Sequence, residues 1–320
     1  MLSFLVTYYN QEKYVSRSLN SIFNQKMTSD FEVIIGDDGS SDKTVEIIKE
    51  YQTKYPNKIK LFIQNRDNTK KYFHIVRASL NRLNILSKAT GDYVCFLDGD
   101  DEYCDLNFAQ NAVDELANNS NIVGIAHKHV IINSNGEKKT YENLSNKELI
   151  SLKDYIKGMY IHAGAIIFHR PKIEELDAVK KMQSFDDNDI TYFFLNKGNL
   201  LYKNLNVYNY YSNEDGFCAS TNELEMKLLN AVDYEIIKNI ISKNHFTLFL
   251  RYWNTIKYIY DSRNELNEEK YQKYRLICIK NGFSDRILSW STLGTLNKCK
   301  VNLSIWFKQQ LFKVARKMKM

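Results

Sequence analysis

One stretch, GDYVCFLDGDD at residues 91–101, constrains the fold of this chain more than any other. Residues 93–97 are mostly apolar and predict a buried strand, which leads directly into a cluster of carboxylates. In an open α/β sheet, ligands bind beyond the carboxyl ends of the strands. We therefore expect Asp98, Asp100 and Asp101 to project into a ligand site.

The carboxylate cluster has two interpretations. Mg²⁺ and Mn²⁺ prefer oxygen ligands and typically use one or two carboxylates, together with water and substrate phosphate. Alternatively, aspartates around a glycine form a turn after a strand and bind nothing. This stretch alone leaves both interpretations open.

Predicted strands and helices alternate through the first 121 residues. Each predicted helix has apolar residues that recur at intervals of three or four. The predicted strands cover residues 3–7, 31–35, 60–64 and 93–97, and the predicted helices cover 15–23, 45–52, 75–87 and 108–116. This alternation predicts an α/β fold with a mostly parallel sheet that helices cover on both faces.

The second half of the chain is predicted to be more mixed. Antiparallel pairing is expected only after about residue 122, with a hairpin turn at Asn135-Gly136. The further predicted elements are a strand at 160–168, a helix at 185–195, extended chain at 200–211, and helices at 228–241 and 246–259. The chain thus divides into an α/β part and a mainly helical C-terminal region.

Composition is typical of a soluble globular protein, with 44% apolar and 26% charged residues in 320. No apolar run approaches the roughly 18 residues of a membrane span, and the first nine residues lack the features of a signal peptide. The five cysteines are scattered and include no CxxC pair, which indicates reduced thiols. These features predict a cytoplasmic protein.

The positive charge is concentrated at the C-terminus. Residues 298–320 contain seven basic residues and no acid, which exceeds the formal charge of +6 of the whole chain. Apolar residues from Leu303 to Met318 share one helical face there, so residues 301–320 are predicted to form a basic amphipathic helix. This helix suits an anionic membrane surface, or it packs on the body or on a partner. A nucleic-acid-binding domain would instead carry positive charge across a folded face.

Three motifs together resemble family 2 glycosyltransferases of the GT-A fold. They are TYYN at residues 7–10, DDGSSD at residues 37–42, and the stretch at residues 91–101, each at the end of a predicted strand. The likeness covers residues 1–215. It implies a GT-A catalytic domain with a Rossmann-like sheet, made of a nucleotide-sugar-binding half at 1–121 and an acceptor and catalytic-base half at 122–215. Residues 216–320 would form the helical C-terminal region.

The resemblance implies a site for the nucleotide of a sugar donor. Thr7, Tyr9 and Asp38 correspond to the family positions that line the pocket for the base and ribose, and Asp38 would accept a hydrogen bond from the base. Arg82 corresponds approximately to a family arginine near the same pocket. Leu83 stands where the family usually has asparagine.

The resemblance also implies a metal site. It places Asp98 near the ribose and the metal, and Asp100 on the metal itself. The expected cofactor is Mn²⁺ or Mg²⁺, which would neutralise the diphosphate leaving group as the glycosidic bond breaks.

An acidic pair about ninety residues beyond the metal motif supplies the catalytic base in this family. Here the pair is Asp186-Asp187, and we assign Asp187 as the base with Asp186 as its neighbour; Asp189 is the rival. An inverting transferase needs such a carboxylate to take the proton of the acceptor hydroxyl. The alternative is an acidic helix start that the helix dipole favours.

The predicted function is a metal-dependent, inverting transfer of a sugar from a nucleoside diphosphate sugar. A UDP-sugar is the expected donor, and a glycan or lipid-linked acceptor of a bacterial surface polysaccharide, such as capsule or lipopolysaccharide, is the expected acceptor. One alternative is a nucleotidyltransferase that makes sugar nucleotides, although no glycine-rich basic loop precedes Phe31. The other is a non-catalytic protein that binds nucleotide sugars as a scaffold. His127 and His129 share a strand face and suggest zinc, but no third ligand with suitable spacing accompanies them.

Overall fold

A computed structural model describes most of the chain. The described residues are 1–66, 74–140, 147–156, 160–180, 185–212, 227, 231, 234, 246–262 and 298–302. The chain divides into two compact units, Met1–Ala219 and Ser220–Met320.

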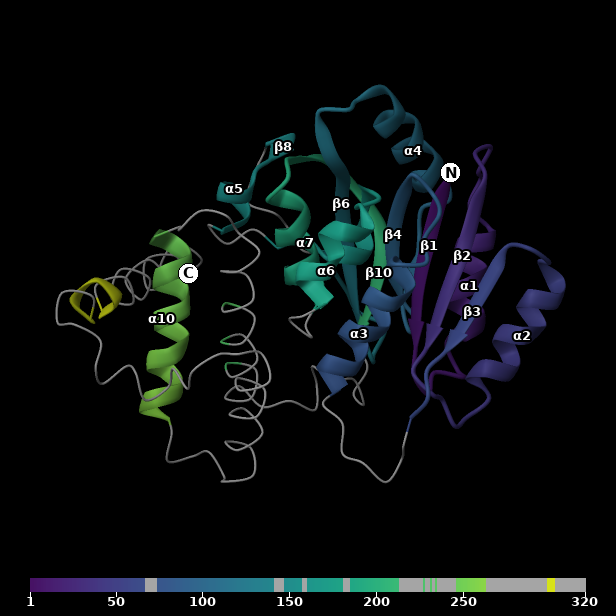
Figure 1. Ribbon diagram of the computed structural model, residues 1–320, viewed down its shortest axis with the longest axis horizontal. Helices are drawn as coiled ribbons and strands as arrows, with labels where there is room; N and C mark the ends of the chain where they lie inside the picture. The colour runs from purple at the N-terminus through teal and green to yellow at the C-terminus, as the bar shows by residue number, and fades with distance from the viewer. Residues whose placement is uncertain are drawn as a thin grey trace. The chain divides into compact units, whose positions relative to one another are not determined.

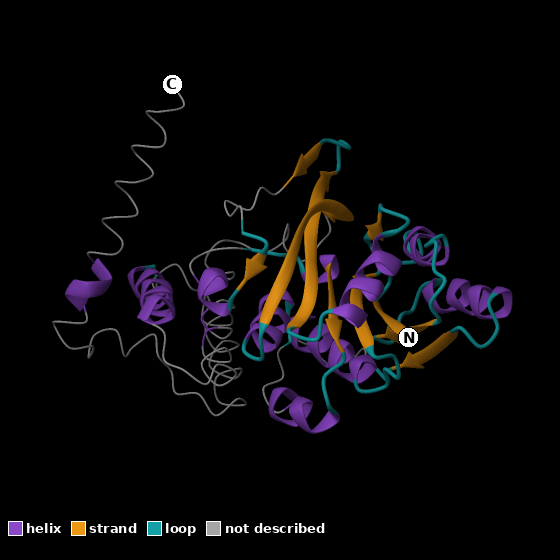
Figure 2. Cartoon of the chain, turned by 90° about the horizontal axis from the view of Figure 1, so that it is seen from above, coloured by secondary structure: helices purple, strands orange, loops and turns teal. Residues whose placement is uncertain are grey.

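The first unit contains one mixed sheet of ten strands (Figures 1 and 2). Its strands are β1 (Leu2–Tyr8), β2 (Phe31–Asp37), β3 (Ile59–Ile63), β4 (Tyr93–Asp98), β5 (Glu102–Tyr103), β6 (Ile122–Asn133), β7 (Lys138–Thr140), β8 (Leu149–Ile150), β9 (Ile166–His169) and β10 (Asn199–Ser212). The order across the sheet is β3-β2-β1-β4-β9-β6-β10-β5, with β7 pairing to β6 and β8 pairing to β10.

The four strands β3, β2, β1 and β4 are parallel, as the alternating pattern predicts. Their middle residues are apolar on both faces because helices cover both sides. Leu5, for example, pairs with Ile34 and Phe96, and all three are buried. The register carries through to the carboxyl ends, where Thr7 pairs with Asp98. The predicted motif residues are therefore brought to one edge of the sheet.

Strand β9 marks the change to mixed pairing, since it runs antiparallel to both β4 and β6. The long strand β10 then runs parallel to β6. The predicted hairpin turn is confirmed, because β6 and β7 pair antiparallel and the Gly136 N–H donates to the Asn133 carbonyl. Gly136 has a φ of 78°, which favours glycine.

Helices cover the two faces of the sheet. The helices of this unit are α1 (Val15–Phe23), α2 (Thr44–Lys54), α3 (His74–Leu86), α4 (Phe108–Asn118), α5 (Leu152–Ile156), α6 (Ile173–Lys180) and α7 (Asp187–Leu195), with a 3-10 turn, η1, at Ala163–Ala165. One core cluster joins apolar residues of α1, α2 and α4 to one face of the strands. On the opposite face, α3 lies close to β2, and the Asn81 amide donates to the Gly36 carbonyl at 2.8 Å. A side chain on Gly36 would collide with Asn81 and Ile85, so glycine is required at this contact.

The strand predicted at residues 160–168 is wrong in its first half. The chain forms η1 there, and only Ile166–His169 joins the sheet. The turn forms because the His162 side chain accepts from the Gly164 N–H and the His162 carbonyl accepts from the Ala165 N–H. Gly164 also lies against the ring of Tyr208, where a Cβ would come within 2.3 Å. The turn holds His162 beside the carboxyl end of β4.

The second unit is described at α10 (Phe246–Asp261) and at a short helical segment, residues 298–302. Helix α10 confirms the helix predicted at 246–259, and it buries Tyr252, Ile256 and Ile259. Of the helix predicted at 228–241, the structure describes residues 231 and 234, and both are helical. The other residues of that helix and the amphipathic face at 303–318 lie outside the described residues. Across the described part of the chain, no helix combines the length and apolar character that crossing a membrane requires.

Candidate active site

The loops that follow β1 and β2 are tied together by polar contacts. The Asn10 N–H donates to Ser40 Oγ at 2.9 Å, and the Ser41 N–H donates to Asn10 Oδ1 at 2.8 Å. Asp37 Oδ1 accepts from the N–H groups of Gly39 and Ser40, which closes the second loop. Two of the three sequence motifs therefore lie in loops that are hydrogen-bonded to each other at the same edge of the sheet.

Asp38 lies at this edge and is 4% exposed. Its Oδ2 accepts from Arg66 Nη1 at 2.8 Å, and Arg77 Nη2 lies 2.6 Å from its Oδ1. The guanidinium of Arg66 also stacks 3.8 Å from the ring centre of Tyr9. The structure thus brings the predicted donor residues Tyr9 and Asp38 together around two arginines that sequence reasoning missed.

Asp98 is the last residue of β4, and its carboxylate contacts another arginine, Arg82. Arg82, from α3, donates through Nη2 to both oxygens of Asp98, at 2.7 and 2.9 Å. Thr7 Oγ1 donates to the same carboxylate at 3.4 Å. The other end of the Arg82 guanidinium, Nη1, lies 3.3 Å from Asp187 Oδ1. Arg82 therefore bridges the predicted metal-site carboxylate and the predicted base.

The charges of this bridge stabilise one another. Burial alone would raise the pKa of Asp98, but the charges of Arg82 and His162 and the hydrogen bonds from Arg82 and Thr7 together lower it. Burial alone would lower the pKa of Arg82, but Asp98 and Asp187 raise it. The site therefore holds a fixed cation between two acidic side chains.

The start of α7 separates the three acids that the sequence left in competition. Asp186 is the N-cap and its side chain accepts from the Asp189 N–H at 2.9 Å, while Asp189 Oδ2 accepts from the Asp186 N–H at 3.3 Å. This reciprocal pair is a capping box. Asp187 takes no part in the box and instead faces Arg82 and His162, with its Oδ2 at 3.4 Å from His162 Nε2. The helix-start interpretation thus accounts for Asp186 and Asp189, and Asp187 faces the site.

Asp101 anchors β10 beneath the site. It is 1% exposed, its Oδ2 accepts from the Tyr208 hydroxyl at 2.7 Å, and its Oδ1 accepts from the Tyr211 N–H at 2.8 Å. Burial, together with the charges of Asp100 and Asp98, raises its pKa well above the ordinary value. Close carboxylates raise one another's pKa when no cation neutralises them, so such a cluster is expected at a cation-binding site.

The carboxylates at the end of β4 suit a small divalent cation. Ligand atoms of Asp98, Asp101 and His162 lie within 4.8 Å of one another, and within the described ranges this is the one such group. Carboxylate oxygens predominate in it, as Mg²⁺ and Mn²⁺ prefer. Asp100, the predicted metal ligand, follows Asp98 by two residues, and its carbonyl accepts from the guanidinium of Arg17. Its assignment to the metal stays a prediction.

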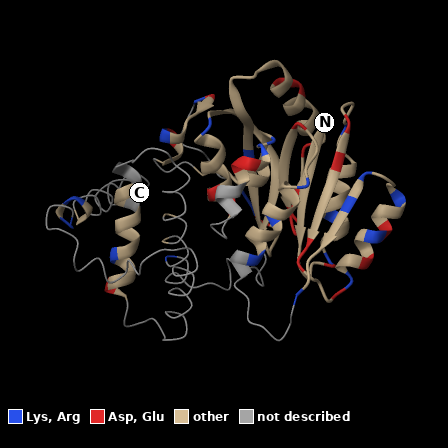
Figure 3. Ribbon diagram, in the orientation of Figure 1, with Lys and Arg blue, Asp and Glu red and all other residues tan. Residues whose placement is uncertain are grey.

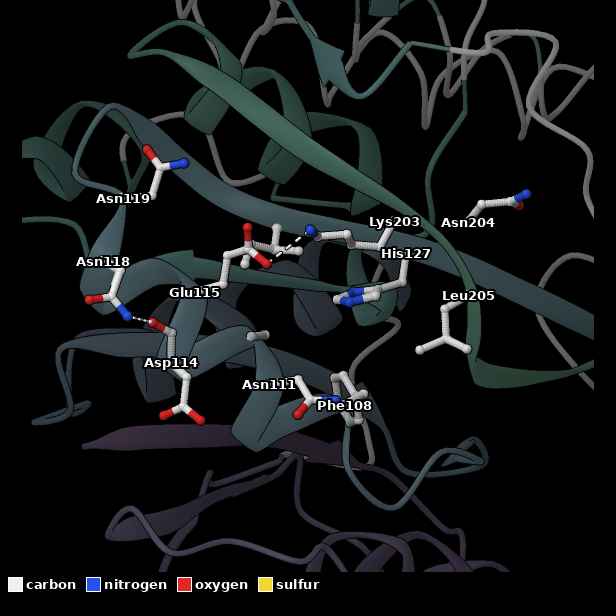
Figure 4. A pocket seen from close by; sticks show the side chains of 12 residues that line it. Phe108, Asn111, Asp114, Glu115, Asn118, Asn119, His127, Lys203, Asn204 and Leu205 are labelled. Atoms are coloured by element: carbon white, nitrogen blue, oxygen red, sulfur yellow. Dashed lines mark hydrogen bonds and ion pairs between the residues drawn. The ribbon is translucent and has the colours of Figure 1, made fainter.

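A groove lies between α4 and the strands β6 and β10 (Figure 4). It has a volume of about 810 Å³ and contains none of the motif residues. Lys203 and Glu115 pair across it at 2.9 Å. His127 lies in its wall with Nδ1 3.3 Å from the Ala165 carbonyl, and burial lowers its pKa to about 4. The groove is thus built largely from groups that already have partners.

The zinc alternative gains no support from the described residues. His129 packs against His162 and Tyr160, with ring centres 5.5 and 5.8 Å apart, and burial lowers its pKa to about 3. Neither His127 nor His129 belongs to a group of three metal-binding side chains in the ranges that the structure describes. Both behave as buried packing residues.

Sequence reasoning missed four side chains around the site: Arg66, Arg77, His162 and Tyr208. Arg66 alone had a usable signal, because it comes just after a predicted strand that ends at the same edge as the motifs. The other three reach the site only through tertiary folding. Acidic and basic residues both occur around the carboxyl ends of the central strands (Figure 3).

Solved structures show the same fold. TarS of Staphylococcus aureus, residues 1–349 in complex with UDP-GlcNAc, matches with a TM-score of 0.61 at 16% identity, over 90% of this chain and 83% of that one. The mannosyltransferase PcManGT of Pyrobaculum calidifontis, in complex with GDP-Man and Mn²⁺, matches with a TM-score of 0.52 at 16% identity, over 99% and 82%. These likenesses show that the chain has a fold of the GT-A class.

The family follows from the sequence. The model of glycosyl transferase family 2 matches residues 3–177, more than half of the chain, and the chain belongs to that family. An uncharacterized glycosyltransferase of Nostoc is 28% identical over 241 residues, which are 71% of this chain and 70% of that protein. TarS, named a poly(ribitol-phosphate) beta-N-acetylglucosaminyltransferase, is 33% identical over 100 residues, which are 31% of this chain and 16% of TarS. The predicted family and enzyme class are confirmed.

Proposed function

We propose that this glycosyltransferase moves a sugar, with inversion at the anomeric carbon, from a nucleoside diphosphate sugar to a hydroxyl of a surface glycan or lipid-linked acceptor. The observation that carries the proposal is the Arg82 bridge, which holds Asp187 beside Asp98 at the end of β4. An inverting transfer needs positive charge beside the leaving diphosphate and a carboxylate that takes the proton of the attacking hydroxyl.

Asp187 is the proposed base. As the acceptor oxygen forms its bond to the anomeric carbon, the bond from that carbon to the diphosphate breaks and the diphosphate leaves with the electron pair. The hydroxyl proton passes to Asp187. Each carboxylate oxygen has two lone pairs, so Asp187 can accept this proton while Arg82 and His162 contact its two oxygens.

The nucleotide is proposed to bind along the edge formed by the first two motifs. Thr7 and Asp98 would face the ribose, and Asp38 with Tyr9 would face the base. Arg66 and Arg77 hold the Asp38 carboxylate in place, so its orientation is set before the donor binds. A UDP-sugar is the proposed donor, and the UDP-GlcNAc complex of TarS supports it.

Mn²⁺ or Mg²⁺ is the proposed cofactor, with Asp98 and Asp100 as its ligands. When bound, the metal would supply positive charge to the departing diphosphate. Both oxygens of Asp101 already accept hydrogen bonds from β10, so we propose that Asp101 supports the site by holding β10 in place. The Mn²⁺ complex of PcManGT, which has a similar fold, supports a divalent metal as cofactor.

A cell-surface polymer is the proposed acceptor class. Two relatives support it by name: TarS, and the minor teichoic acid biosynthesis protein GgaA of Bacillus subtilis, which is 29% identical over 181 residues. Membrane contact through residues 301–320 remains part of this proposal, although residues 303–320 lie outside the described ranges.

The test is donor turnover by the purified chain. UDP-GlcNAc, UDP-glucose, UDP-galactose and GDP-mannose would each be incubated with Mn²⁺, and the released nucleoside diphosphate would be measured. We expect the wild type to consume one of these donors and Asp187→Asn to consume none. The matched control is Asp30→Asn, at an exposed aspartate before β2, which should consume the same donor as the wild type. Equal release by Asp187→Asn would remove Asp187 from the mechanism.

A further inference from the structure

His162 lies beside Asp187, and a backbone N–H group determines which of its ring nitrogens carries the proton. It is 3% exposed, and its Nδ1 accepts a hydrogen bond from the Gly164 N–H at 3.1 Å. A ring nitrogen that accepts a hydrogen bond carries no proton, so in the neutral ring the proton is on Nε2. The turn η1 therefore selects one tautomer of His162.

That tautomer presents a donor to Asp187. His162 Nε2 lies 3.4 Å from Asp187 Oδ2, and Arg82 Nη1 lies 3.3 Å from Asp187 Oδ1. Contacts of this length in a ligand-free site tighten when the substrate binds. Each oxygen of Asp187 thus faces one N–H donor, and together the two donors fix the rotation of the carboxylate.

The imidazole of His162 is held in this orientation by its neighbours. It stacks on Tyr208 with ring centres 4.7 Å apart and planes inclined by 29°, and it contacts Tyr210 at 5.4 Å. Tyr208 is fixed in turn, because its hydroxyl donates to Asp101. A ring packed in this way keeps Nε2 at 3.4 Å from Asp187 Oδ2 before any substrate binds.

The same geometry argues against metal ligation by His162, although one of its nitrogens lies within 4.8 Å of ligand atoms of Asp98 and Asp101. A histidine binds a metal through an unprotonated nitrogen. Nδ1 uses its lone pair on Gly164, and Nε2 carries the proton that faces Asp187. Ligation would require one of these two contacts to break.

We infer that His162 is a positioning residue for the base: it donates from Nε2 to Asp187, and it neither binds the metal nor touches the donor. The inference rests on the proposed function of Asp187. Removing the donor should lower the rate of transfer, because small displacements of a catalytic group are costly, while leaving binding of donor and metal unchanged.

The kinetic test compares two variants of His162. His162→Leu removes the N–H, and we expect kcat to fall about 10- to 100-fold with donor KM and Mn²⁺ half-saturation unchanged. His162→Gln retains an N–H at a similar reach and should recover most of kcat. His169→Gln, at the end of β9, is the matched control. A raised Mn²⁺ requirement in both His162 variants, or an unchanged kcat in His162→Leu, would overturn the inference.

A second measurement does not depend on turnover. Long-range ¹H–¹⁵N spectra of the imidazole report which nitrogen carries the proton. We expect His162 to be protonated at Nε2 both without and with Mg²⁺. Loss of that proton on addition of Mg²⁺ would identify a metal ligand instead. If the wild type consumed no donor, the proposed function would fail, and these spectra would still decide between the two roles of His162.

Discussion

Arg82 Nη1 lies 3.3 Å from Asp187 Oδ1, although the two residues come from helices separated by about a hundred positions in the chain. The same guanidinium holds Asp98 through Nη2. This single side chain therefore links the end of β4, where the donor diphosphate is proposed to bind, to the start of α7, where the proposed base lies.

Replacing Arg82 should affect both function and stability. Arg82→Met leaves Asp98 and Asp187 facing each other without a cation. These groups are only partly buried, so we expect a cost below the about 3–5 kcal/mol of breaking a fully buried ion pair. We expect a lower free energy of unfolding in urea and loss of donor turnover. Arg82→Lys keeps the charge but cannot reach both carboxylates in the same way, so it should recover more stability than activity. Full activity in Arg82→Lys would contradict the bridging role.

The two acids of α7 should behave differently. Asp187→Asn should lower turnover by about 10²- to 10⁴-fold, because the proposed base is lost, with donor affinity nearly intact. Asp189→Ala should instead lower the free energy of unfolding and leave turnover largely intact, because Asp189 is the N3 residue of the capping box with Asp186. Turnover assays and thermal melts on both variants check this pair. The opposite pattern would make Asp189 the base.

Arg77 should contribute to nucleotide binding through Asp38. Arg77→Met removes the contact at 2.6 Å and leaves the nearly buried Asp38 carboxylate with fewer partners. A charged hydrogen bond contributes about 1.5–3 kcal/mol, so we expect affinity for UDP to fall about tenfold or more in calorimetric titration. Unchanged affinity for UDP would mean that the uracil base binds elsewhere.

Glu32 should stabilise the parallel half of the sheet in a pH-dependent manner. Burial would raise its pKa, but hydrogen bonds from Lys60, Ser3 and Thr90 lower the pKa to about 2. The folded protein therefore binds the proton more weakly than the unfolded chain. Stability from Glu32 is present above the ordinary pKa of 4.5 and is lost as the pH falls from there towards 2.

The measurement is chemical unfolding of the wild type and Glu32→Gln at several pH values. At pH 7 we expect Glu32→Gln to be less stable by about 1–3 kcal/mol, because the amide leaves polar partners unsatisfied. The difference should shrink as the pH falls below 4.5. Glu50→Gln, at an exposed position of α2, should show no such trend. A constant difference at all pH values would reject the assigned cause.

The parallel half of the fold was predictable because local patterns determine it. Apolar runs at residues 3–7 and 31–35 each end in a polar turn, and parallel pairing brings those turns together. The half-strand error at residues 160–165 arose because apolar residues there suggested a strand. The chain instead turns at Gly164, under a tyrosine from β10 that local patterns cannot place.

The sequence proposed several residues of the candidate site, but not the contacts between them. Family resemblance singled out Asp98, Arg82 and Asp187, while nothing in the sequence indicates that one guanidinium bridges the two acids. The capping box likewise could not be predicted from the sequence, since DDND at residues 186–189 offers several acids for the same role. His162 had no signal at all, because its contact with Asp187 depends on the turn that replaces the predicted strand.

We propose that a nucleoside diphosphate binds with a divalent metal at the carboxylates that end β4. Calorimetric titration of the wild type with UDP and GDP, in Mn²⁺ and then in EDTA, tests it most directly. Asp100→Asn is the matched variant. We predict binding of one diphosphate in Mn²⁺ that is lost in EDTA and weakened in Asp100→Asn. Binding of equal strength in EDTA, or no binding of either diphosphate in Mn²⁺, would contradict the account.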